Sequence, residues 1–512
     1  GVHLGLAALV ALQTALHGMD LSMLRGPGPG LGAIVLAGAL IWLLRSGSAG
    51  QSSLARGSGD RLPGWGLAAL GPFLVLQLTL LVNVGRVQVQ AGWELPAASL
   101  VILLGLAAAV AVQGWSWPYP VRLAAAGLAV ALLAQPDLIR GAGVLLLIPL
   151  QAALGVTMAS ALASPAAGST TGAGRHAAGV YAWTVVGAGA LLALVFLFYQ
   201  TYEWQGLWPI LAGLIALPAL VPGPGAATMD AAPSSATARF RTLGAHGRRA
   251  VLAVLIIGAA GLTTGQVVRG APPATVPAPA ELVVLSYNIH HGFDTFGVPG
   301  PEAIARVIER IGADIVGLQE VGRGWNVNSG VDLMAWLRWR LPQYHAVYGP
   351  MNGDLWGNAI LSKYPIAAWG WVHYPIRLSP FERGLTWAEI PTVRGNVLVV
   401  TTHFSAHPGH EPDRLGQAGD LLAFWDERPR SIIVGDINAR PYEDPVRRLI
   451  DAGLVDVPAA HGLGETFTAR SHRLSERIDY IFTSPDIGSI SAVVPHTLAS
   501  DHLPVVATVR LD

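Results

Sequence analysis

The chain has 512 residues, no cysteine and a formal net charge of zero at pH 7. Its length allows at least two domains, and the absence of cysteine excludes disulfides and thiolate metal sites. The zero charge hides two opposed halves. Residues 1–269 carry 13 basic and 6 acidic side chains, a net +7, whereas residues 270–512 carry 19 basic and 26 acidic side chains, a net −7.

Long apolar runs recur through the first half, at about 2–16, 31–44, 64–84, 96–113, 120–134, 141–163, 177–199, 206–221 and 250–268. Most approach the ~20 residues that a helix needs to cross a bilayer core of ~30 Å, and several are rich in glycine and alanine, as closely packed membrane helices are. The alternative is the buried helical core of a soluble protein, which nine runs almost without internal charge disfavour. We therefore expect an all-α polytopic membrane domain of about nine helices over residues 1–269. Because Gly1 lies inside an apolar run, we expect the natural N-terminus upstream.

The arginines between these runs predict an orientation. With nine spans, one set of alternating loops holds nine arginines and the other set holds four. The first set is Arg45, Arg56, Arg61, Arg122, Arg175, Arg239, Arg241, Arg248 and Arg249, and the second is Arg25, Arg86, Arg140 and Arg269. The positive-inside rule places the richer set in the cytoplasm. The ninth span then delivers the rest of the chain to the outer side of the cytoplasmic membrane.

Residues 270–280, Gly-Ala-Pro-Pro-Ala-Thr-Val-Pro-Ala-Pro-Ala, predict a proline-rich linker. At ~3.1 Å per residue in an extended polyproline form, it reaches about 30 Å at most. It would hold the following domain close to the membrane surface.

From residue 281, short apolar strands alternate with amphipathic helices, which predicts one mixed α/β domain over 281–512. We expect strands near 282–287, 314–319, 358–362, 366–374, 384–390, 396–403, 431–435, 478–483, 488–495 and 504–510. Helices are expected near 301–311, 331–341, 412–425 and 443–451.

Polar side chains fall at the ends of these apolar strands. They are Asn288, Glu320, His403, Asp436 with Asn438, Asp479, and the pair Asp501–His502 before the last strand. Strand ends in a sheet tend to face one rim, so we expect these groups to converge there. Acids, carboxamides and histidines without cysteine favour Mg²⁺, with Mn²⁺ as a possible substitute, over a thiolate zinc site.

Seven motifs in this half carry a family resemblance. They are Ser-Tyr-Asn-Ile-His at 286–290, Leu-Gln-Glu at 318–320, Gly-Asn-Ala-Ile-Leu-Ser-Lys-Tyr-Pro at 357–365, Thr-His-Phe at 402–404, Gly-Asp-Ile-Asn at 435–438, Arg-Ile-Asp-Tyr-Ile at 477–481 and Ser-Asp-His at 500–502. In this order they resemble the endonuclease/exonuclease/phosphatase superfamily, which includes DNase I, apurinic endonucleases, inositol polyphosphate 5-phosphatases and neutral sphingomyelinases. The resemblance implies a four-layer α/β sandwich with the site at the rim of two packed sheets.

The resemblance also implies a role for each residue. Glu320 is the principal metal ligand, with Asn288 and Asp501 close to the ion. Asp436 orients or deprotonates the attacking water, and Asn438 holds a phosphate oxygen. His502, paired with Asp479, acts as a base or stabilises charge on the phosphoryl group, and His403 assists the leaving group. Such parts suit an anionic phosphodiester, whose hydrolysis needs a cation, an aligned water and a proton donor.

Three further residues are predicted to contact the substrate: His290, which follows Asn288, Asn358 in the third motif, and Arg323 in a loop. An ordinary loop role is the alternative for His290, and surface packing is the alternative for Arg323.

The charge of the second half bears on the substrate. Nucleic-acid binding normally needs a basic face, which a net charge of −7 disfavours. A catalytically dead membrane scaffold would have lost a catalytic position, and none is missing. The arrangement of the two halves resembles the GPI-anchor ceramide-remodelling family. We therefore expect an integral membrane, metal-dependent phosphodiesterase acting on a lipid or lipid-linked phosphodiester at the outer face. The alternatives are an extracytoplasmic endonuclease or exonuclease, and a phosphomonoesterase of the inositol-phosphatase type.

Overall fold

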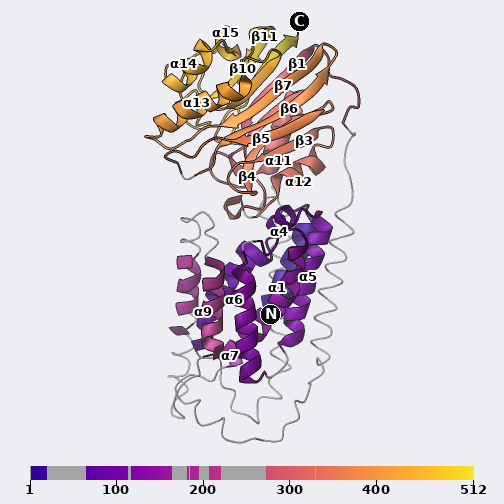
Figure 1. The fold of residues 1–512 in the computed structure, drawn as a ribbon, viewed down its shortest axis with the longest axis vertical. Helices are drawn as coiled ribbons and strands as arrows, with labels where there is room; N and C mark the ends of the chain where they lie inside the picture. Colours follow the sequence, from indigo (N-terminus) through magenta and orange to yellow (C-terminus); the bar gives the residue numbers. More distant parts are fainter. Residues whose placement is uncertain are drawn as a thin grey trace, which may run out of the picture. The chain divides into compact units, whose positions relative to one another are not determined.

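The computed structural model describes residues 2–19, 65–113, 117–135, 137–163, 182–183, 185–194, 207–220, 273–328, 330–379 and 381–511. The chain divides into two compact units, one before Val267 and one from Val267 to Asp512 (Figure 1).

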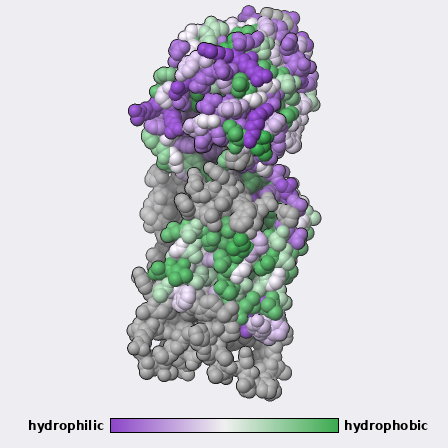
Figure 2. Space-filling model, turned by 60° about the vertical axis from the view of Figure 1, so that its left-hand side comes forward, coloured by the Kyte–Doolittle hydropathy of each residue, from purple (hydrophilic) through white to green (hydrophobic). Residues whose placement is uncertain are grey.

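The first unit is helical in its described part. Its longer helices are α1 (Val2–Ala15), α3 (Leu70–Leu76), α4 (Val84–Ala91), α5 (Leu95–Val112), α6 (Tyr119–Leu133), α7 (Leu147–Ala163) and α9 (Leu207–Leu220), joined by the short turns η2 (Trp65–Ala69), η3 (Gln77–Leu81) and η4 (Gly141–Leu146). In α5, Ile102 and Leu106 are fully buried while Leu100 and Leu104 are exposed. Helices that are apolar on both their packed and their exposed faces are typical of a lipid environment, and Figure 2 shows hydrophobic atoms at the surface of this unit.

Two helices among the described residues are long and apolar enough to cross a membrane, Leu95–Val112 and Gly141–Ala161. A third candidate is the pair Gly66–Leu81 and Val84–Ala91, which is bent by 47° at its break. The predicted runs 31–44 and 250–268 lie outside the described residues, and 177–199 is described only in part. The count of nine spans therefore stays a prediction.

Two orientation markers, Arg86 and Arg122, need correction, and Arg122 lies inside α6. Arg86 was predicted to lie in a loop between spans, but the structure places it inside α4, where it is only 3% exposed. A separate helix begins where the apolar run ends, because Asn83 caps the start of α4 by accepting a hydrogen bond from the Arg86 backbone N–H. Arg122 and Arg140 are also described, whereas the other ten arginines of the orientation argument lie outside the described residues.

The second unit contains two six-stranded mixed sheets. The first has the order β11 (Ile487–Val493), β12 (Val505–Leu511), β1 (Glu281–Asn288), β2 (Ile315–Gly322), β4 (Trp356–Ser362), β3 (His345–Pro350). The second has the order β5 (Ala368–His373), β6 (Gly384–Thr392), β7 (Gly395–His403), β8 (Ser431–Asp436), β10 (Asp479–Thr483), β9 (Val455–Asp456). In each sheet one parallel pair, β1–β2 or β7–β8, lies between antiparallel neighbours.

The two parallel pairs arise from two β-α-β segments. The crossover helices are α11 (Pro301–Ile311) and α13 (Glu411–Trp425), and the remaining helices of the unit are α12 (Leu333–Arg340), α14 (Asp444–Asp451) and α15 (Val457–Ala460), with short turns at η6 (His290–Gly292) and η7 (Asn326–Asn328). A parallel pair needs such a long crossover, which returns the chain to the same end of the sheet. In each sheet the two parallel strands therefore end at the same edge, and the candidate site lies at these strand ends.

Apolar side chains of the two sheets pack against each other. Leu282, Val284 and Ile360 of the first sheet share a core with Val399, Ile432 and Ile481 of the second. On its outer face, the second sheet packs against α13 and α14 through Leu421 and Leu449. The predicted arrangement of two mixed sheets with flanking helices is confirmed. The sequence analysis missed β3, β9 and α15, which are short and lack a clear apolar period.

The predicted linker is partly built into this unit. Ala278 is fully buried, its backbone N–H donates to Pro391, and its carbonyl accepts from Val393. Further upstream, the Ala274 N–H donates to Lys363, and the carbonyl of Ala274 lies 2.9 Å from His345 Nε2. The second half of the proline-rich segment therefore belongs to the folded unit, because its backbone groups pair with strand edges. The stretch able to act as a free tether is shorter than predicted.

Candidate active site

Backbone register places three predicted residues in one row across the second sheet. Gly384 pairs with His403, His403 with Asp436, and Asp436 with Asp479. Directly paired residues point to the same face of a sheet. That face is the one toward the first sheet, because the neighbouring Val399, Val434 and Ile481 lie in the core between the sheets. The three polar side chains thus continue the apolar core out to its rim, and each is at most 1% exposed.

Asn288 and Asn358 reach the same space from the first sheet. Each lies an even number of residues from a core residue of its own strand, Val284 for Asn288 and Ile360 for Asn358. Both side chains are almost fully buried. The rim of the interface between the sheets therefore holds polar groups from both sheets.

Glu320 reaches this space through an irregularity in β2. Gln319 points between the sheets, since its Nε2 donates to Thr401 Oγ1 at 2.9 Å. In a regular strand Glu320 would then face the opposite side. Instead, the pairing with β4 shifts between Leu318 and Val321, and Glu320 has a φ of +58°. Such a bulge re-aims a side chain, and here it turns the carboxylate toward the histidines of the site.

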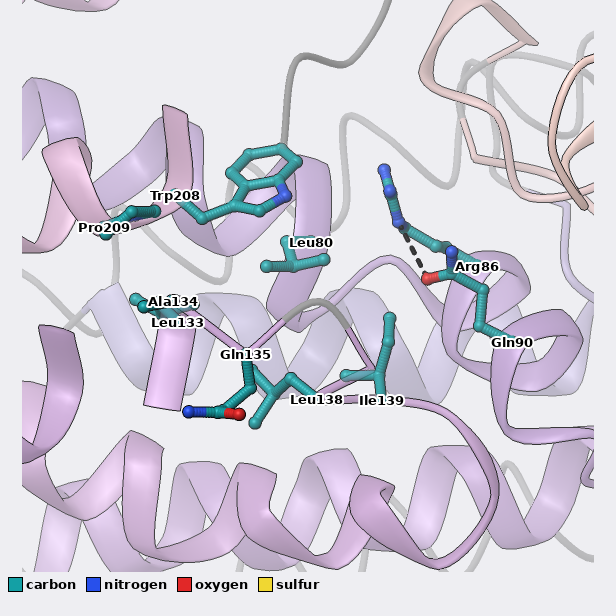
Figure 3. Close-up of a pocket in the computed structure, with 10 residues that line it drawn as sticks. All are labelled: Leu80, Arg86, Gln90, Leu133, Ala134, Gln135, Leu138, Ile139, Trp208 and Pro209. Atoms are coloured by element: carbon teal, nitrogen blue, oxygen red, sulfur yellow. Dashed lines mark hydrogen bonds between the residues drawn. The ribbon is translucent and has the colours of Figure 1, made fainter. Parts of the chain in front are cut away.

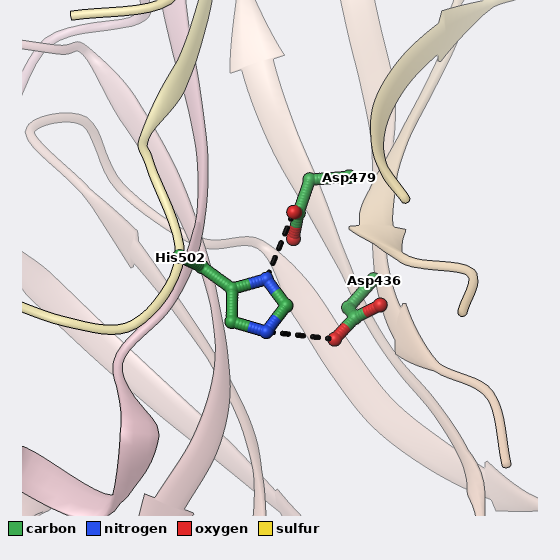
Figure 4. A group of neighbouring side chains, drawn as sticks. All are labelled: Asp436, Asp479 and His502. Atoms are coloured by element: carbon green, nitrogen blue, oxygen red, sulfur yellow. Dashed lines mark hydrogen bonds and ion pairs between the residues drawn. The ribbon is translucent and has the colours of Figure 1, made fainter. Parts of the chain in front are cut away.

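The centre of the site is an acid–histidine–acid group formed by Asp479, His502 and Asp436 (Figure 4). His502 Nδ1 lies 2.8 Å from Asp479 Oδ2, and its Nε2 lies 3.6 Å from Asp436 Oδ2. Burial alone would lower the pKa of His502, but the two carboxylates, Asp479 first, raise it well above its usual value. His502 is therefore a protonated imidazolium that donates to Asp479.

Asp436 is held by hydrogen bonds to both of its oxygens. Asn288 Nδ2 donates to Oδ2 at 3.0 Å, and the backbone N–H of Asn438 donates to Oδ1 at 3.0 Å. Burial raises the pKa of Asp436, and the charges of Asp479 and Glu320 add to that rise. Asn438 adopts a φ of +51°, and its own amide donates to the Phe404 carbonyl, which leaves its second amide N–H for a ligand.

Three oxygen-bearing side chains surround the adjacent histidines 290 and 291. His291 Nε2 lies 3.0 Å from Glu320 Oε2, and His290 Nδ1 lies 3.6 Å from Asp501 Oδ1. The His290 backbone N–H donates to Asn288 Oδ1 at 3.0 Å. Burial alone would raise the pKa of Glu320, but the charge of His291 and the hydrogen bond with it hold this pKa well below its usual range.

This donor set fits a divalent cation. Two carboxylates and one carboxamide oxygen are the hard ligands that Mg²⁺ and Mn²⁺ prefer, and the side chains of Glu320, Asp501 and Asn288 supply these groups. Asp436, Asp479 and His502 also lie close enough together to hold an ion, with all ligand atoms within 4.8 Å of one another. His502 Nδ1 is already paired with Asp479 there, so that group suits proton chemistry better than coordination.

Arg383, which the sequence analysis did not select, also belongs to this site. Arg383 immediately precedes Gly384, the first residue of the row that includes His403, Asp436 and Asp479, and its guanidinium lies 4.7 Å from the ring centre of Trp356. Its Nε and Nη1 are buried and make no hydrogen bond within the described part of the chain. Burial lowers the pKa of Arg383 to about 10, although Glu320 and Asp436 favour its charged form.

Arg383 also acts on His403. The imidazole of His403 lies 3.5 Å from Asp436 Oδ2 and 3.9 Å from Glu320 Oε1. Burial and the charge of Arg383 nevertheless lower the pKa of His403 well below its usual value. His403 is therefore a neutral imidazole in this site.

The predicted substrate contacts differ in their surroundings. His290 lies beside Asp501, and Asn358 Nδ2 donates to Gly384 while its Oδ1 is buried without a hydrogen-bond partner among the described residues. Arg323 makes a two-pronged ion pair with Asp332, at 2.9 Å for both hydrogen bonds, and Asp332 caps α12. That pair commits its guanidinium to the fold, and its contact with a substrate stays a prediction.

Comparison with known proteins agrees with the architecture of the second unit. Residues 285–502 match the Endonuclease/Exonuclease/phosphatase family and form a domain of that family. Among solved structures, an endonuclease/exonuclease/phosphatase from Beutenbergia cavernae is 25% identical, with 45% of this chain and 72% of that chain covered and a TM-score of 0.40. A family protein from Bacteroides thetaiotaomicron is 20% identical (47% and 97% covered, TM-score 0.40). A mannosyl-6-phosphatase from the same organism is also 20% identical (44% and 99% covered, TM-score 0.39). No curated protein sequence matches the chain.

Proposed function

We propose, from the family of residues 285–502, that the second unit is a divalent-metal-dependent phosphodiesterase whose substrate is a lipid or lipid-linked phosphodiester at the outer face of a cytoplasmic membrane. The observation that carries the reaction type is the rim between the two sheets. There His502 Nε2 lies 3.6 Å from Asp436 Oδ2, and His403 Nε2 lies 3.5 Å from Asp436 Oδ2 and 3.9 Å from Glu320 Oε1.

Asp436 and His502 divide the proton chemistry between them. Asp436 is fixed by Asn288 and Asn438, and its raised pKa makes it a base of useful strength for a water molecule. His502, charged and oriented by Asp479, stabilises the negative charge that develops on the phosphoryl oxygens.

Glu320, Asn288 and Asp501 would hold the cation, which when bound neutralises the phosphoryl group and lowers the barrier to attack. Arg383 adds a second, permanent positive charge at the same rim. Because Nε and Nη1 of Arg383 are buried, the charge on its guanidinium is poorly screened and acts strongly on a phosphate oxygen. The neutral His403 is a hydrogen-bond donor for the leaving oxygen and not a charged acid.

A lipid substrate is supported by apolar side chains at the edge of the second sheet. Trp369, Trp371 and Val372 of β5 are 39–46% exposed, and Ile376 and Leu378 in the following connection are 58–60% exposed. His373, at the end of β5, pairs with Gly384, which pairs in turn with His403. The connection after β5 therefore begins beside the candidate site. Exposed tryptophans are typical of the membrane interface. The net charge of −7 in this half gives little support to a nucleic-acid substrate.

Hydrolysis by the purified full-length protein tests the reaction type. With Mg²⁺ we expect release of a soluble head group from vesicles containing phosphatidylinositol, measured by mass spectrometry. Glu320→Gln and His502→Ala should each lower turnover by about 10³-fold or more, because each removes a charged group that acts on the reacting phosphate. Arg306→Gln is the control, since this exposed arginine pairs only with Glu302 within the described residues.

Three outcomes separate the candidate functions. Full activity in either Glu320→Gln or His502→Ala would remove the site assignment. Nicking of plasmid DNA without lipid cleavage would favour an extracytoplasmic nuclease. Release of inorganic phosphate from inositol phosphates in place of phosphodiester cleavage would favour a phosphomonoesterase.

A further inference from the structure

Large apolar side chains are exposed in three adjoining segments of the second unit. Phe296 and Val298 lie in the loop that follows η6 and are 67% and 48% exposed. Leu474, between α15 and β10, is 38% exposed, and Leu498, before Asp501, is 43% exposed. Exposed apolar side chains that gather in one neighbourhood mark surfaces that bind a protein or a membrane.

Hydrogen bonds join these segments and order the first loop. The Thr295 N–H donates to the Leu498 carbonyl at 3.2 Å, and Thr295 Oγ1 lies 2.7 Å from His472 Nδ1. The ring of His472 lies 5.9 Å from the ring of Phe296. Asp294 Oδ1 accepts from two backbone N–H groups of the loop, at 2.9 and 3.0 Å. The apolar side chains are thus carried by ordered backbone, so a partner would cost them little conformational entropy.

The same segments adjoin the candidate site. The row of paired residues across the second sheet runs from His373 on β5 to Asp479 on β10. At its Asp479 end, Thr468 Oγ1 accepts from the Asp479 N–H at 3.2 Å, and the Ser471 N–H donates to the Asp501 carbonyl at 2.7 Å. The exposed apolar residues of the connection after β5 follow its other end. Exposed apolar side chains therefore flank the candidate site at both ends.

Two arginines add positive charge at the Asp479 end. Arg470 and Arg473 are exposed and lie in the same turn as Leu474, where the Arg473 N–H donates to the Arg470 carbonyl. Neither side chain makes an ion pair within the described residues. Glu476, the acid that follows this turn, is already paired with Arg440 at 2.9 Å. In a half with a net charge of −7, the exposed arginines form a local positive surface beside apolar side chains.

The helical unit holds an arginine in a different way. Arg86 lines a cavity of about 190 Å³ and is only 3% exposed (Figure 3). Its Nε donates to Gln90 Oε1 at 3.2 Å, and its guanidinium carbon lies 5.5 Å from the ring centre of Trp208. Arg86 is thus engaged inside its own unit, whereas the guanidinium groups of Arg470 and Arg473 are accessible to a partner.

We propose that these segments dock on an anionic lipid bilayer. The docking patch consists of the exposed residues Phe296, Val298, Arg470, Arg473, Leu474 and Leu498. A bilayer presents phosphate groups above hydrocarbon, which matches arginines beside apolar side chains. The same chain carries two candidate membrane spans, so a bilayer is the partner at hand. The role of the patch in catalysis rests on the proposed function, because docking would bring lipid head groups to His502. The contact itself can be measured without any hydrolysis, so its failure and that of the proposed function are distinguishable.

Site-specific fluorescence tests the contact, because the chain has no cysteine and a single introduced thiol can be labelled. Val298→Cys carries the environment-sensitive dye NBD within the patch and keeps Phe296. The full-length protein is reconstituted in phosphatidylglycerol nanodiscs that contain lipids with a nitroxide on the acyl chain. We expect quenching about threefold stronger than for the same dye at Val393→Cys, because only the patch would reach the acyl boundary. Val393 is 66% exposed and lies just after β6, at the end away from the site.

Substitutions in the labelled protein separate the apolar and the charged contributions. Phe296→Ser should lower the quenching by about half or more, because it removes the most exposed apolar side chain of the patch. Arg470→Gln together with Arg473→Gln should remove the stronger quenching in phosphatidylglycerol than in phosphatidylcholine nanodiscs. The matched control, Arg394→Gln together with Arg510→Gln, removes two exposed arginines at strand ends away from the site and should change neither signal.

Leu498→Ser, at another exposed position, keeps the test valid if Phe296→Ser does not fold. Equal quenching at Val298→Cys and Val393→Cys would overturn the proposal, since it would indicate adsorption without a preferred surface. Quenching that none of the patch substitutions changes would overturn it as well. A dye that responds to a single-stranded oligonucleotide and not to nitroxide lipids would also overturn it, in favour of a nucleic-acid partner.

Discussion

Arg383 places a positive charge beside Glu320 and Asp436, two acids that the proposed chemistry needs in their ionised form. The guanidinium lies against Trp356 and makes no hydrogen bond through Nε or Nη1 within the described residues. A substrate phosphate at the rim would satisfy those two donors. Arg383 could therefore bind an anionic substrate through its Nε and Nη1 donors.

The first prediction concerns this residue. Arg383→Gln should lower kcat/KM for a phosphodiester about 10- to 100-fold, since a hydrogen bond to a charged group contributes ~1.5–3 kcal/mol. Arg383→Lys should recover part of the loss, because it restores the charge without the fork. Arg394→Gln provides the comparison: this exposed arginine lies in the turn at the other end of β6. Unchanged kinetics in Arg383→Gln would remove the residue from the site.

At this scale the sequence identified the residues that end apolar strands and missed those that do not. Asn288, His403 and Asp436 each come at the end of a mainly apolar segment, and such a segment can be recognised from the sequence alone. Arg383 sits in Phe-Glu-Arg-Gly, which reads like any polar loop. Its place in the site follows from the pairing of Gly384 with His403, and that pairing joins segments that no local pattern connects.

Among the elements, α11 and α12 are joined by a charged cluster. Arg340 of α12 bonds both Glu302 and Glu309 of α11 at 2.7–3.0 Å, and Glu302 also accepts from Arg306. Burial alone would raise the pKa of Glu302, but the hydrogen bonds from Arg340 and Arg306 lower it. A carboxyl whose pKa is lowered on folding stabilises the protein above its unfolded pKa, and this contribution disappears as the pH falls through the folded value.

The second prediction follows from that sign. Glu302→Gln should lower the thermal midpoint of the second unit at pH 7 by about 2–4 °C or less, since a partly exposed pair contributes at most about 1 kcal/mol. The difference from the parent protein should shrink as the pH falls below 4.5, the ordinary pKa of the group. Differential scanning calorimetry of the full chain measures both. Glu281→Gln, whose carboxylate is 55% exposed beside Arg510, should show no such dependence.

The elements also show where local sequence is a sufficient guide. Strands β7 and β8 and helix α13 were predicted within one residue at most of their ends, because apolar periodicity and the proline near the start of α13 define them. Strand β3, His-Ala-Val-Tyr-Gly-Pro, contains only two apolar residues besides its tyrosine, Ala346 and Val347. Its pairing with β4 makes it a strand. The proline-rich segment was read as a free linker because its backbone partners, Pro391 and Lys363, lie far away in sequence.

For the whole molecule, the two halves differ so much in composition that their classes could be predicted separately. The charge of each half and the length of the apolar runs separate a helical unit from an α/β unit. How many helices cross a membrane could not be settled in the same way, because two of the nine predicted runs and ten of the thirteen arginines used for orientation lie outside the described residues. The outward orientation of the second unit therefore stays a prediction.

The last prediction concerns the action of the second unit on a lipid surface. If the second unit works on a lipid surface, replacing Trp369 and Trp371 together by serine should raise the apparent KM for vesicle-bound phosphodiester about tenfold. The kcat for a soluble diester such as bis(4-nitrophenyl) phosphate should stay unchanged, because the side chains act on the interface and not on the reacting group. Val393→Ser, an exposed apolar residue at the opposite end of β6, controls for loss of surface hydrophobicity. An equal loss on both substrates would argue for a structural role of β5.

The bulge in β2 has a consequence for how the Glu320 carboxylate is held. Strand pairing with β4 resumes at Val321 and Gly322, so the backbone is hydrogen-bonded to its neighbour on both sides of Glu320. A carboxylate on a loop would lose conformational entropy each time a ligand fixed it. Here that entropy is lost once, when the sheet forms, and little reorganisation remains for the moment of reaction. The left-handed backbone at Glu320 is thus strain that folding sustains, and it leaves the carboxylate ordered before any ligand arrives.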